Sequence, residues 1–341
     1  MSVAAEPLLT VEDLHTYLAT GQGVVRAVDG VSFTLGQAEV LGIVGESGCG
    51  KTVTCRTIMG LTPRRIAYSS GQVIYHPWGD GNILDLSQRE LQKLRGTHLA
   101  MIFQDPMTAL NPVRSIGDQL IEAVTAHARL PRAQARDRAI DLLTTVGIPA
   151  ADRRMRDYPF QFSGGMLQRA LIAIALASSP RLLLADEPTT SLDVIIQDQI
   201  LSLLLELQRD TGMSMILVSH DLAVITEVCD RVIVMYGGQV VEEGDTATII
   251  TAPSHPYTKA LLEALPQGGH RGPLRSIPGA PPSLIDTPAG CRFVPRCPLA
   301  MHECTGWTTE LVETGGPGHR ARCWRHHEVG RTTAWQASDS A

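Results

Sequence analysis

The sequence contains no apolar run long enough to cross a bilayer as a helix, which takes roughly 18 to 20 residues. Stretches such as ALIAIALA at 170–177 are much shorter and are typical of buried helix. The opening segment MSVAAEPLLTVEDL also lacks the basic start and apolar core of a secretory signal. We therefore expect the chain to be made and kept in the cytosol.

The sequence also has no excess of basic residues. Its 29 lysines and arginines against 35 aspartates and glutamates give a formal net charge of −6. Nucleic-acid-binding proteins usually carry a basic face, so this balance argues against that class. A chain of 341 residues, 44% hydrophobic and 19% charged, is typical of a globular protein with one large domain and a smaller one.

Cysteine is scarce, and its distribution is uneven. Four of the seven cysteines lie near the end of the chain: Cys291, Cys297, Cys304 and Cys323. Thiols stay reduced in the cytosol, so the pattern favours a metal or redox site over a disulfide framework.

Three interpretations of these four cysteines stay open. Zinc sites use closely spaced cysteine pairs, which gaps of five, six and eighteen residues do not supply. Iron–sulfur clusters accept looser spacing, and Cys297-Pro298 matches the Cys-Pro of ferredoxin sequences. Reduced thiols without a metal are the third interpretation. Zinc stays open because four histidines lie nearby: His302, His319, His326 and His327.

Short apolar runs alternate with amphipathic stretches along most of the chain. The runs predict strands buried on both faces, at 40–45, 99–103, 181–186, 213–219 and 231–236. The stretch at 193–212 has apolar residues at helical spacing and ends on Gly212, a helix stop signal. Gly237-Gly238 predicts a hairpin. This alternation indicates an α/β core with a mainly parallel sheet.

Two segments depart from that alternation. Residues 107–178 are rich in helix formers and predict a helical subdomain inserted into the core. The segment at 266–290 is rich in proline and glycine and predicts a linker. We therefore expect a core domain at 1–265 and a cysteine-bearing extension at 266–341. We find no internal repeat.

A glycine-rich loop follows the first predicted core strand. The G-x-x-x-x-G-K-T pattern comprises Gly45, Glu46, Ser47, Gly48, Cys49, Gly50, Lys51 and Thr52. Its glycines let backbone N–H groups turn toward phosphate oxygens, and the next helix adds its N-terminal dipole. The pattern predicts that Lys51 reaches the β- and γ-phosphates and that the Thr52 hydroxyl binds Mg²⁺. Cys49, near the helix start, is expected to have a lowered pKa and to make the protein thiol-sensitive.

Two adjacent carboxylates follow the strand predicted at 181–186. Asp186 ends that strand and is expected to hold Mg²⁺ through water. Glu187 is expected to polarise the water that attacks the γ-phosphate. A strand that ends in acids is common, so the assignment depends on the upstream phosphate loop.

The stretch QFSGGMLQR at 161–169 narrows the class. Ser163, Gly164 and Gly165 open an apolar helix and predict an anion-binding helix start. With all these motifs, the chain resembles the ATP-binding subunits of ABC transporters. Their signature Leu-Ser-Gly-Gly-Gln stands here as Phe162-Ser163-Gly164-Gly165-Met166, and in that family it completes the ATP site of the opposite subunit.

The resemblance implies roles for four more residues. Gln104 matches the glutamine that senses Mg²⁺ and water, Asp193 matches the loop that contacts the other subunit, and His220 matches the histidine at the γ-phosphate. Tyr17 is the candidate to stack on adenine, although the family's aromatic residue aligns better with Leu18. The implied fold is a P-loop NTPase core with an inserted helical subdomain, an antiparallel β element and the small cysteine-rich extension.

The tail sharpens the resemblance to the peptide-importer branch, the oligopeptide, dipeptide and nickel group. That branch carries a His-Pro-Tyr segment, here His255-Pro256-Tyr257, and then a cysteine-bearing tail that binds a four-iron–four-sulfur cluster. Pro256 also suits a plain helix start. The resemblance thus implies ATP, Mg²⁺ and a 4Fe-4S cluster as cofactors.

The resemblance also implies partners and a place in the cell. The partners are a second homologous ATPase subunit, two membrane-spanning permease subunits and an extracytoplasmic substrate-binding protein. The expected location is peripheral, on the cytoplasmic face of the inner membrane. Two alternatives stay open: import of nickel or another small solute, and a regulatory nucleotide-binding module that does not hydrolyse ATP.

Overall fold

The computed structural model describes residues 7–127, 130–190, 192–265, 277–306 and 310–331. The expected linker at 266–290 and extension at 266–341 therefore lie partly outside the described residues. The chain divides into two compact units. Unit 1 contains Met1–Leu9, Leu35–Glu39 and Ile74–Val218. Unit 2 contains Thr10–Thr34, Val40–Val73 and Ser219–Ala341.

Unit 1 contains three parallel strands with buried side chains. β6 (Leu182–Asp186) lies between β5 (Leu99–Ile102) and β7 (Ser214–Ser219). Leu182 pairs with Leu99 on one side and with Ser214 on the other. Apolar runs predict all three strands, and the prediction is confirmed. A strand buried on both faces needs apolar residues throughout, which is why the runs identify these strands.

Several helices of unit 1 begin at residues whose side chains cap them. α8 (Val194–Thr211) has Asp193 as its N-cap and the left-handed Gly212 at its end, as the sequence predicts. The remaining helices are η1 (His76–Trp78), η2 (Ile83–Asp85), α2 (Gln88–Thr97), α3 (Pro106–Ala109), α4 (Ile116–Thr125), α5 (Arg132–Thr145), α6 (Ala151–Arg154), η3 (Pro159–Gln161) and α7 (Gly164–Leu176).

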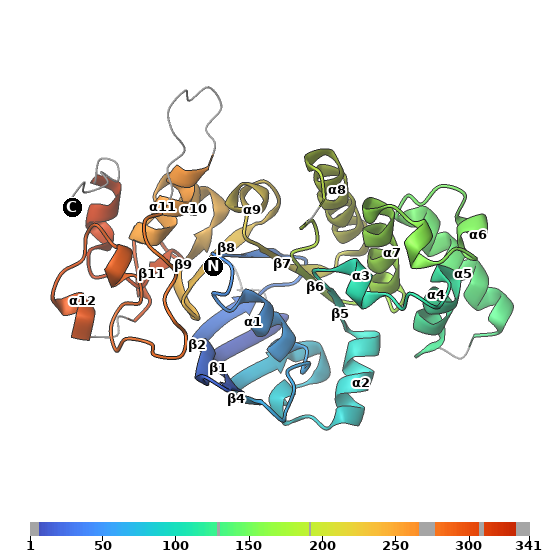
Figure 1. The fold of residues 1–341 in the computed structure, drawn as a ribbon, viewed down its shortest axis with the longest axis horizontal. Coiled ribbons are helices and arrows are strands. Elements are labelled where there is room, and N and C mark those ends of the chain that lie inside the picture. Colours follow the sequence, from blue (N-terminus) through green and yellow to red (C-terminus); the bar gives the residue numbers. More distant parts are fainter. Residues whose placement is uncertain (1–6, 128–129, 191, 266–276, 307–309, 332–341) are drawn as a thin grey trace, which may run out of the picture. The chain divides into compact units, whose positions relative to one another are not determined.

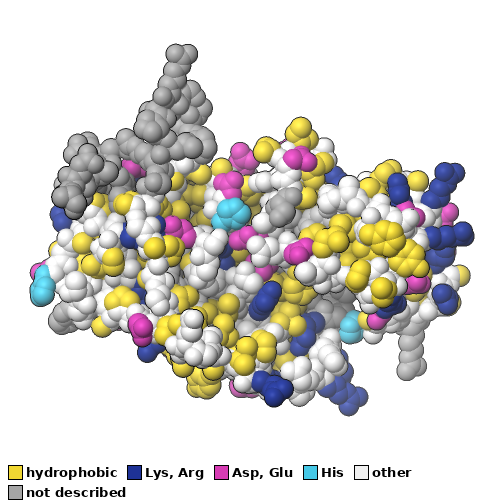
Figure 2. Space-filling model, in the orientation of Figure 1, with side chains coloured by type: hydrophobic (Ala, Val, Ile, Leu, Met, Phe, Trp, Pro, Cys, Tyr) yellow, Lys and Arg dark blue, Asp and Glu magenta, His cyan; other side chains and the backbone are white. Residues whose placement is uncertain are grey.

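The segment 107–178 of unit 1 contains helices and no strand among its described residues. Several of its large apolar side chains are exposed. Figure 2 shows hydrophobic side chains gathered over α3, α4 and α7 on the face drawn. The exposed residues of this kind are Met107, Val113, Tyr158 and Phe160.

Unit 2 contains a three-stranded sheet and part of a larger one (Figure 1). The small sheet has the order β2 (Gly23–Leu35), β1 (Leu9–Thr20), β4 (Ala67–Tyr75). In the other, β3 (Val40–Val44) pairs in parallel with β8 (Arg231–Tyr236). β8 pairs antiparallel with β9 (Gln239–Asp245), and left-handed Gly237 and Gly238 form the predicted hairpin turn between them. β11 (Arg320–Ala321) joins β9, and β10 (Val312–Glu313) joins β11.

The helices of unit 2 are short. They are α1 (Lys51–Ile58), α9 (Leu222–Val228), α10 (Thr246–Thr251), α11 (Pro256–Ala264), η4 (Val294–Arg296), α12 (Glu303–Gly306) and η5 (His326–Arg331). α11 begins with Pro256 after the N-cap His255, so the expected helix start is confirmed. In the described parts of both units, no helix combines the length and the hydropathy needed to span a membrane.

Candidate functional site

The glycine-rich loop of unit 2 lies between the buried strand β3 and the helix α1. Gly45 and Gly50 both have positive φ. A Cβ on Gly45 would lie 2.2 Å from the Met235 carbonyl oxygen, and one on Gly50 would lie 2.1 Å from the Ala27 carbonyl oxygen. Only glycine fits at either position, so these contacts fix the path of the loop.

Lys51 folds back onto this loop. Its side chain is buried, and its ammonium group donates to the carbonyl oxygens of Gly45 at 2.7 Å and Glu46 at 3.1 Å. Ser47 and Gly48 are exposed, and a Cβ on Gly48 would meet nothing within 4 Å. A cationic group inside a loop of backbone amides, open to solvent at its tip, is suited to hold an anion.

Cys49 contradicts the expectation of a reactive thiol. Its side chain is buried in the loop, and burial raises the pKa of the thiol even though the Lys51 ammonium lies nearby. The thiolate is the reactive form, so burial disfavours reaction at this thiol. The prediction of thiol sensitivity at Cys49 was wrong because it weighed the helix dipole and not the burial.

The two predicted carboxylates of unit 1 lie at the carboxyl end of β6. Asp186 is the last residue of the strand and is fully buried. Glu187 follows with φ +47°, a conformation in which a non-glycine residue is strained, and its amide donates to the Val218 carbonyl at 3.0 Å. The sheet therefore holds the Glu187 backbone in place.

Gln104 and Glu187 meet although 83 residues separate them. The Gln104 amide nitrogen donates to Glu187 Oε2 at 2.9 Å. The Thr190 hydroxyl donates to the same oxygen at 2.9 Å. Thr190 was not among the predicted residues, because a threonine three positions after a glutamate gives no signal of its own.

The predicted anion-binding helix start lies at α7. Ser163 Oγ accepts from the Met166 amide at 3.4 Å, which makes it the N-cap. Ser163 and Gly164 are exposed. A Cβ on Gly165 would lie 2.8 Å from Ile196 Cγ2 in α8, so glycine lets the two helices approach.

The other two predicted polar residues of the core also lie at helix starts or strand ends. Asp193 caps α8 by accepting from the Ile196 amide at 3.0 Å, and it is exposed. His220 follows the last residue of β7 and is also exposed. Asp221, the next residue, caps α9 through the Ala223 amide at 2.9 Å.

Tyr17 in unit 2 is half-buried in a polar network. Its hydroxyl donates to Asp29 at 2.6 Å, and the Arg26 guanidinium lies 5.6 Å from the ring centroid. Burial, and then the hydrogen bond to Asp29, raise the pKa of Tyr17 to about 12. Arg292 of the cysteine-bearing tail donates to the Gly237 carbonyl and to Asp29. No local sequence pattern predicts the Arg292–Asp29 pair, because 263 residues separate the partners.

The four tail cysteines of unit 2 line one small cavity of about 20 Å³, together with His255 and Phe293. None of them forms a disulfide. Burial, with a smaller effect of the neighbouring sulfurs, raises the pKa of Cys297 and Cys323 to about 12. The pattern at the end of the sequence therefore does bring the four thiols to one place.

The described residues nevertheless contain no group of three or more histidine, cysteine, aspartate or glutamate side chains arranged to hold a metal ion. A cavity of about 20 Å³ has room for roughly one water molecule. His319, a candidate zinc ligand, is instead 2.8 Å from the buried Glu242 carboxylate. The donor set matches the predicted cluster, and the arrangement of the donors does not.

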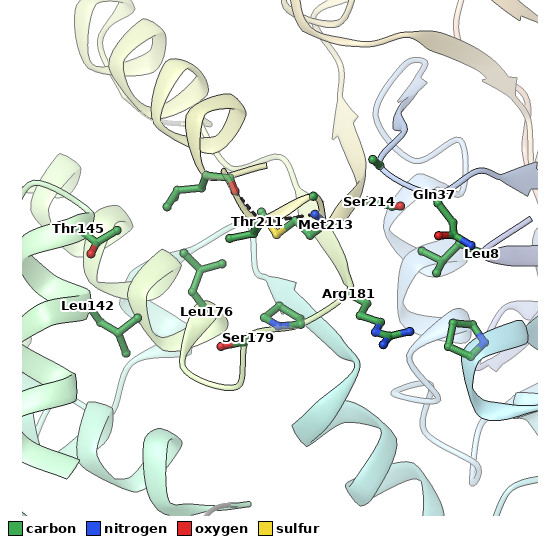
Figure 3. Close-up of a pocket in the computed structure, with 15 residues that line it drawn as sticks. Leu8, Gln37, Leu142, Thr145, Leu176, Ser179, Arg181, Thr211, Met213 and Ser214 are labelled. Carbon is green, nitrogen blue, oxygen red and sulfur yellow. Dashed lines mark hydrogen bonds between the residues drawn. The ribbon is translucent and has the colours of Figure 1, made fainter. Parts of the chain in front are cut away.

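Unit 1 contains a second, larger cavity of about 530 Å³ (Figure 3). Arg181 and Ser214, which precede or begin β6 and β7, line it together with Gln37 and Leu176. Ligands of parallel sheets bind at the carboxyl ends of the strands, whereas this cavity lies at the amino ends, away from Asp186. We do not assign it to the candidate site.

The fold, the phosphate loop and the carboxylates at a strand end define a P-loop nucleotide-binding protein. A family model described as "ABC transporter" matches residues 28–190, and one described as "Oligopeptide/dipeptide transporter, C-terminal region" matches 241–304. The solved structure of the ATP-binding cassette MJ0796, a dimer bound to ADP and phosphate, is similar with a TM-score of 0.62 and 26% identity. It covers 70% of this chain and 98% of its own.

Relatives of similar length show the family. A protein of Sinorhizobium fredii named "Probable peptide ABC transporter ATP-binding protein y4tR" is 47% identical over 95% of this chain and 97% of its own. The dipeptide transport ATP-binding protein DppD of Bacillus subtilis is 46% identical over 94% of this chain and 95% of its own. The chain belongs to the family of ABC transporter ATP-binding proteins and is an ATPase.

Proposed function

We propose that this chain is the ATPase subunit that powers import of di- and oligopeptides through a membrane ABC transporter. The observation that carries the proposal is the match of residues 241–304 to the C-terminal region of oligopeptide and dipeptide transporters. The matched region includes the His-Pro-Tyr segment at 255–257 and reaches Cys304. Relatives that cover nearly the whole chain are named for dipeptide and oligopeptide transport.

We propose that the loop at 45–52 binds the phosphates of ATP. Lys51 exchanges its contacts with the Gly45 and Glu46 carbonyls for phosphate oxygens, and the loop amides add hydrogen bonds. Tyr17 is our candidate for the adenine contact. The half-buried position of its ring, held by Asp29, supports this role.

The donor set also fits Mg²⁺, which prefers hard oxygen ligands. We propose the Thr52 hydroxyl, the Asp186 carboxylate through water, and the Gln104 amide oxygen as its ligands. The Gln104 amide nitrogen already donates to Glu187, which leaves the oxygen as the atom suited to a cation. Bound there, Mg²⁺ neutralises charge that develops on the phosphates.

We propose that Glu187 orients and polarises the attacking water. Its strained backbone and its bonds to Gln104 and Thr190 hold the carboxylate in place, so little reorganisation is needed during reaction. Lys51 and His220 then stabilise charge on the γ-phosphate. The water's proton passes to Glu187 as the oxygen–phosphorus bond forms and ADP leaves.

We propose that a second, homologous ATPase subunit completes the site, as a heterodimer. Ser163, Gly164 and Asp193 are exposed. Val194 and Ile195, directly after Asp193, are 82% and 72% exposed, which is unusual for large apolar residues. An anion-binding helix start next to exposed apolar residues suits contact with the ATP and the surface of another subunit.

We propose that two permease subunits dock on the helical segment of unit 1, which places the chain peripherally on the cytoplasmic face of the inner membrane. The exposed apolar side chains over α3, α4 and α7 support this assignment (Figure 2). Met107 lies three residues after Gln104, so docking there reaches the residue that contacts Glu187. The substrate-binding protein acts indirectly, through the permeases, and nucleic acid is not a partner.

We also propose the core and extension boundaries at 265 and 266, and a 4Fe-4S cluster on Cys291, Cys297, Cys304 and Cys323. Convergence of the four thiols on one cavity supports the cluster. The cavity has to widen to accept it, and binding has to displace the thiol protons. The test is elemental analysis and a visible absorption spectrum of the purified protein. Iron and sulfide together with visible absorbance would support the cluster, whereas zinc alone, or no metal, would contradict it.

The experiment for the transport proposal is reconstitution of the chain with its permeases, partner ATPase and binding protein in proteoliposomes. We expect uptake of labelled dipeptide that requires ATP and is lost in Lys51→Ala. Nickel uptake without peptide uptake would instead favour the alternative cargo. ATP binding without hydrolysis in the full complex would favour a regulatory module.

A further inference from the structure

The tail segment between Cys291 and Cys297 reaches back to the phosphate loop within unit 2. Arg296 donates from Nη1 to Glu46 Oε2 at 2.6 Å and from Nη2 to Glu46 Oε1 at 2.9 Å. This is the two-point geometry in which a guanidinium holds a carboxylate most firmly. The Arg296 side chain is 3% exposed and that of Glu46 is 25% exposed, so water only partly screens the pair.

The other donors of Arg296 fix its position. Nε donates to the Pro278 carbonyl at 2.8 Å, and Nη1 also reaches the Tyr236 hydroxyl at 3.2 Å. Phe293, in the same segment, packs against Tyr236 and Tyr257 with ring centroids 5.1 and 5.4 Å apart. The guanidinium is therefore held by its surroundings and does not follow the carboxylate as a mobile surface arginine would.

Glu46 is held from its backbone as well. Its amide donates to the Tyr257 hydroxyl at 2.8 Å, and its carbonyl accepts from Lys51. Tyr257 belongs to the His-Pro-Tyr segment, and His255 of that segment lines the thiol cavity. Two residues from the C-terminal part of the chain thus fix one residue of the phosphate loop.

Glu46 places a negative charge inside a loop that is expected to bind a polyanion. It directly follows Gly45 in that loop. A like charge at this range weakens anion binding, and an arginine on the carboxylate removes most of that repulsion. We propose that Arg296 is a positioning residue for ATP binding: it neutralises Glu46 and holds it in place, so that the tail sets the affinity of the loop.

This inference rests on the proposed phosphate-binding role of residues 45–52, and its test separates the two. The probe is MgATP, titrated against a fluorescent ATP analogue on the full chain. Lys51→Ala tests the loop itself and is expected to abolish binding. Normal binding by Lys51→Ala would overturn the role of the loop, whereas the Arg296 variants test only the inference.

Arg296→Gln leaves the Glu46 carboxylate unpaired and is expected to raise the Kd for MgATP about tenfold, the size of one partly screened charge repulsion. The defect should shrink as salt is added, because salt screens the repulsion. Glu46→Gln in the same background removes the charge, and the double variant should return to within about threefold of the wild type. A double variant as weak as Arg296→Gln would mean that Arg296 only supports packing.

Two further variants keep the test decisive. Arg320→Gln breaks another arginine–glutamate pair of the tail, with Glu243, away from the phosphate loop. It should leave the Kd unchanged, and a similar tenfold loss there would contradict the inference. Arg296→Lys keeps the charge but cannot reproduce the two-point contact, so its Kd is expected to lie between those of the wild type and Arg296→Gln. This variant also keeps the test decisive if Arg296→Gln does not fold. A loss equal to that of Arg296→Gln would overturn the proposal.

Discussion

The phosphate loop and the helix start at Ser163 are both suited to bind an anion, but they differ in burial and in the contacts that hold them. In the loop, Lys51 is buried and bonded to neighbouring carbonyls, and the tail holds Glu46. At the start of α7, Ser163 and Gly164 are exposed, and the hydroxyl only caps its own helix. The loop is thus assembled within the chain, while the helix start presents a surface suited to another subunit.

The largest expected effect is a loss of hydrolysis that leaves the phosphate loop and the helix start at Ser163 unchanged. Glu187→Gln keeps the side-chain shape and an acceptor for Gln104 but removes the base, so turnover should fall about 10²- to 10⁴-fold. ATP binding should stay near the wild-type value, because the variant does not change the loop. Phosphate release by the reconstituted complex measures turnover. A variant that hydrolyses ATP at a near wild-type rate would refute the role of Glu187.

A smaller effect should distinguish the helix start from the loop. Ser163→Asp keeps a good N-cap but adds a negative charge. We expect this charge to lie next to the γ-phosphate of the ATP bound by the partner ATPase subunit, so turnover should fall about tenfold or more. The Kd for MgATP of the isolated chain should not change. Ser163→Asn, a neutral cap, is the matched control. Equal loss in both variants would mean that shape, and not charge, matters there.

The exposed apolar pair after Asp193 allows a test of the partner surface. Replacing Val194 and Ile195 by serine removes apolar area without disturbing the core, and we expect about a tenfold weaker ATP-dependent association. Sedimentation of this variant in the Glu187→Gln background with the partner ATPase measures it. Ile250→Ser, at an exposed position of α10, is the control. An unchanged association constant would exclude the pair from the interface.

The smallest effect concerns the second anchor of the tail, Arg292 on Asp29. Burial opposes ionisation of Asp29, but bonds from Tyr17 and the charge of Arg292 prevail and lower the pKa of its carboxyl. Its contribution is therefore present above the ordinary carboxyl pKa and is lost as the pH falls. Asp29→Asn should lower the free energy of unfolding by about 1 kcal/mol at pH 7, and this difference should shrink below about pH 4. Urea titrations at both pH values measure it, and a constant difference would contradict the ion pair.

The sequence predicted the parts of this molecule that local patterns determine. Apolar runs gave β5 to β7, Asp193 and Gly212 marked the ends of α8, and Pro256 marked the start of α11. Family motifs named Gln104 and Glu187 separately, and their hydrogen bond needed only that two neighbouring parallel strands end at one edge of a sheet.

The tail contacts, the protonation of Cys49 and the cavity of the tail cysteines depend on contacts between distant residues, which no local sequence pattern contains. Arg296 and Arg292 resemble any other arginines of the tail, and their partners lie in the first fifty residues. The thiol of Cys49 was misread because burial by distant residues decides its pKa. The four tail cysteines were correctly singled out, but spacing alone does not reveal the size of the cavity they share.

The contact between Glu46 and Arg296 also has a consequence in time. The two residues are 250 positions apart, and a ribosome that adds about 5 to 20 residues per second needs roughly 12 to 50 s to make the chain between them. During synthesis the loop exists long before the arginine that neutralises it. A nascent chain therefore carries its phosphate loop with an unpaired carboxylate until the tail emerges, and the loop reaches its final state among the last events of folding.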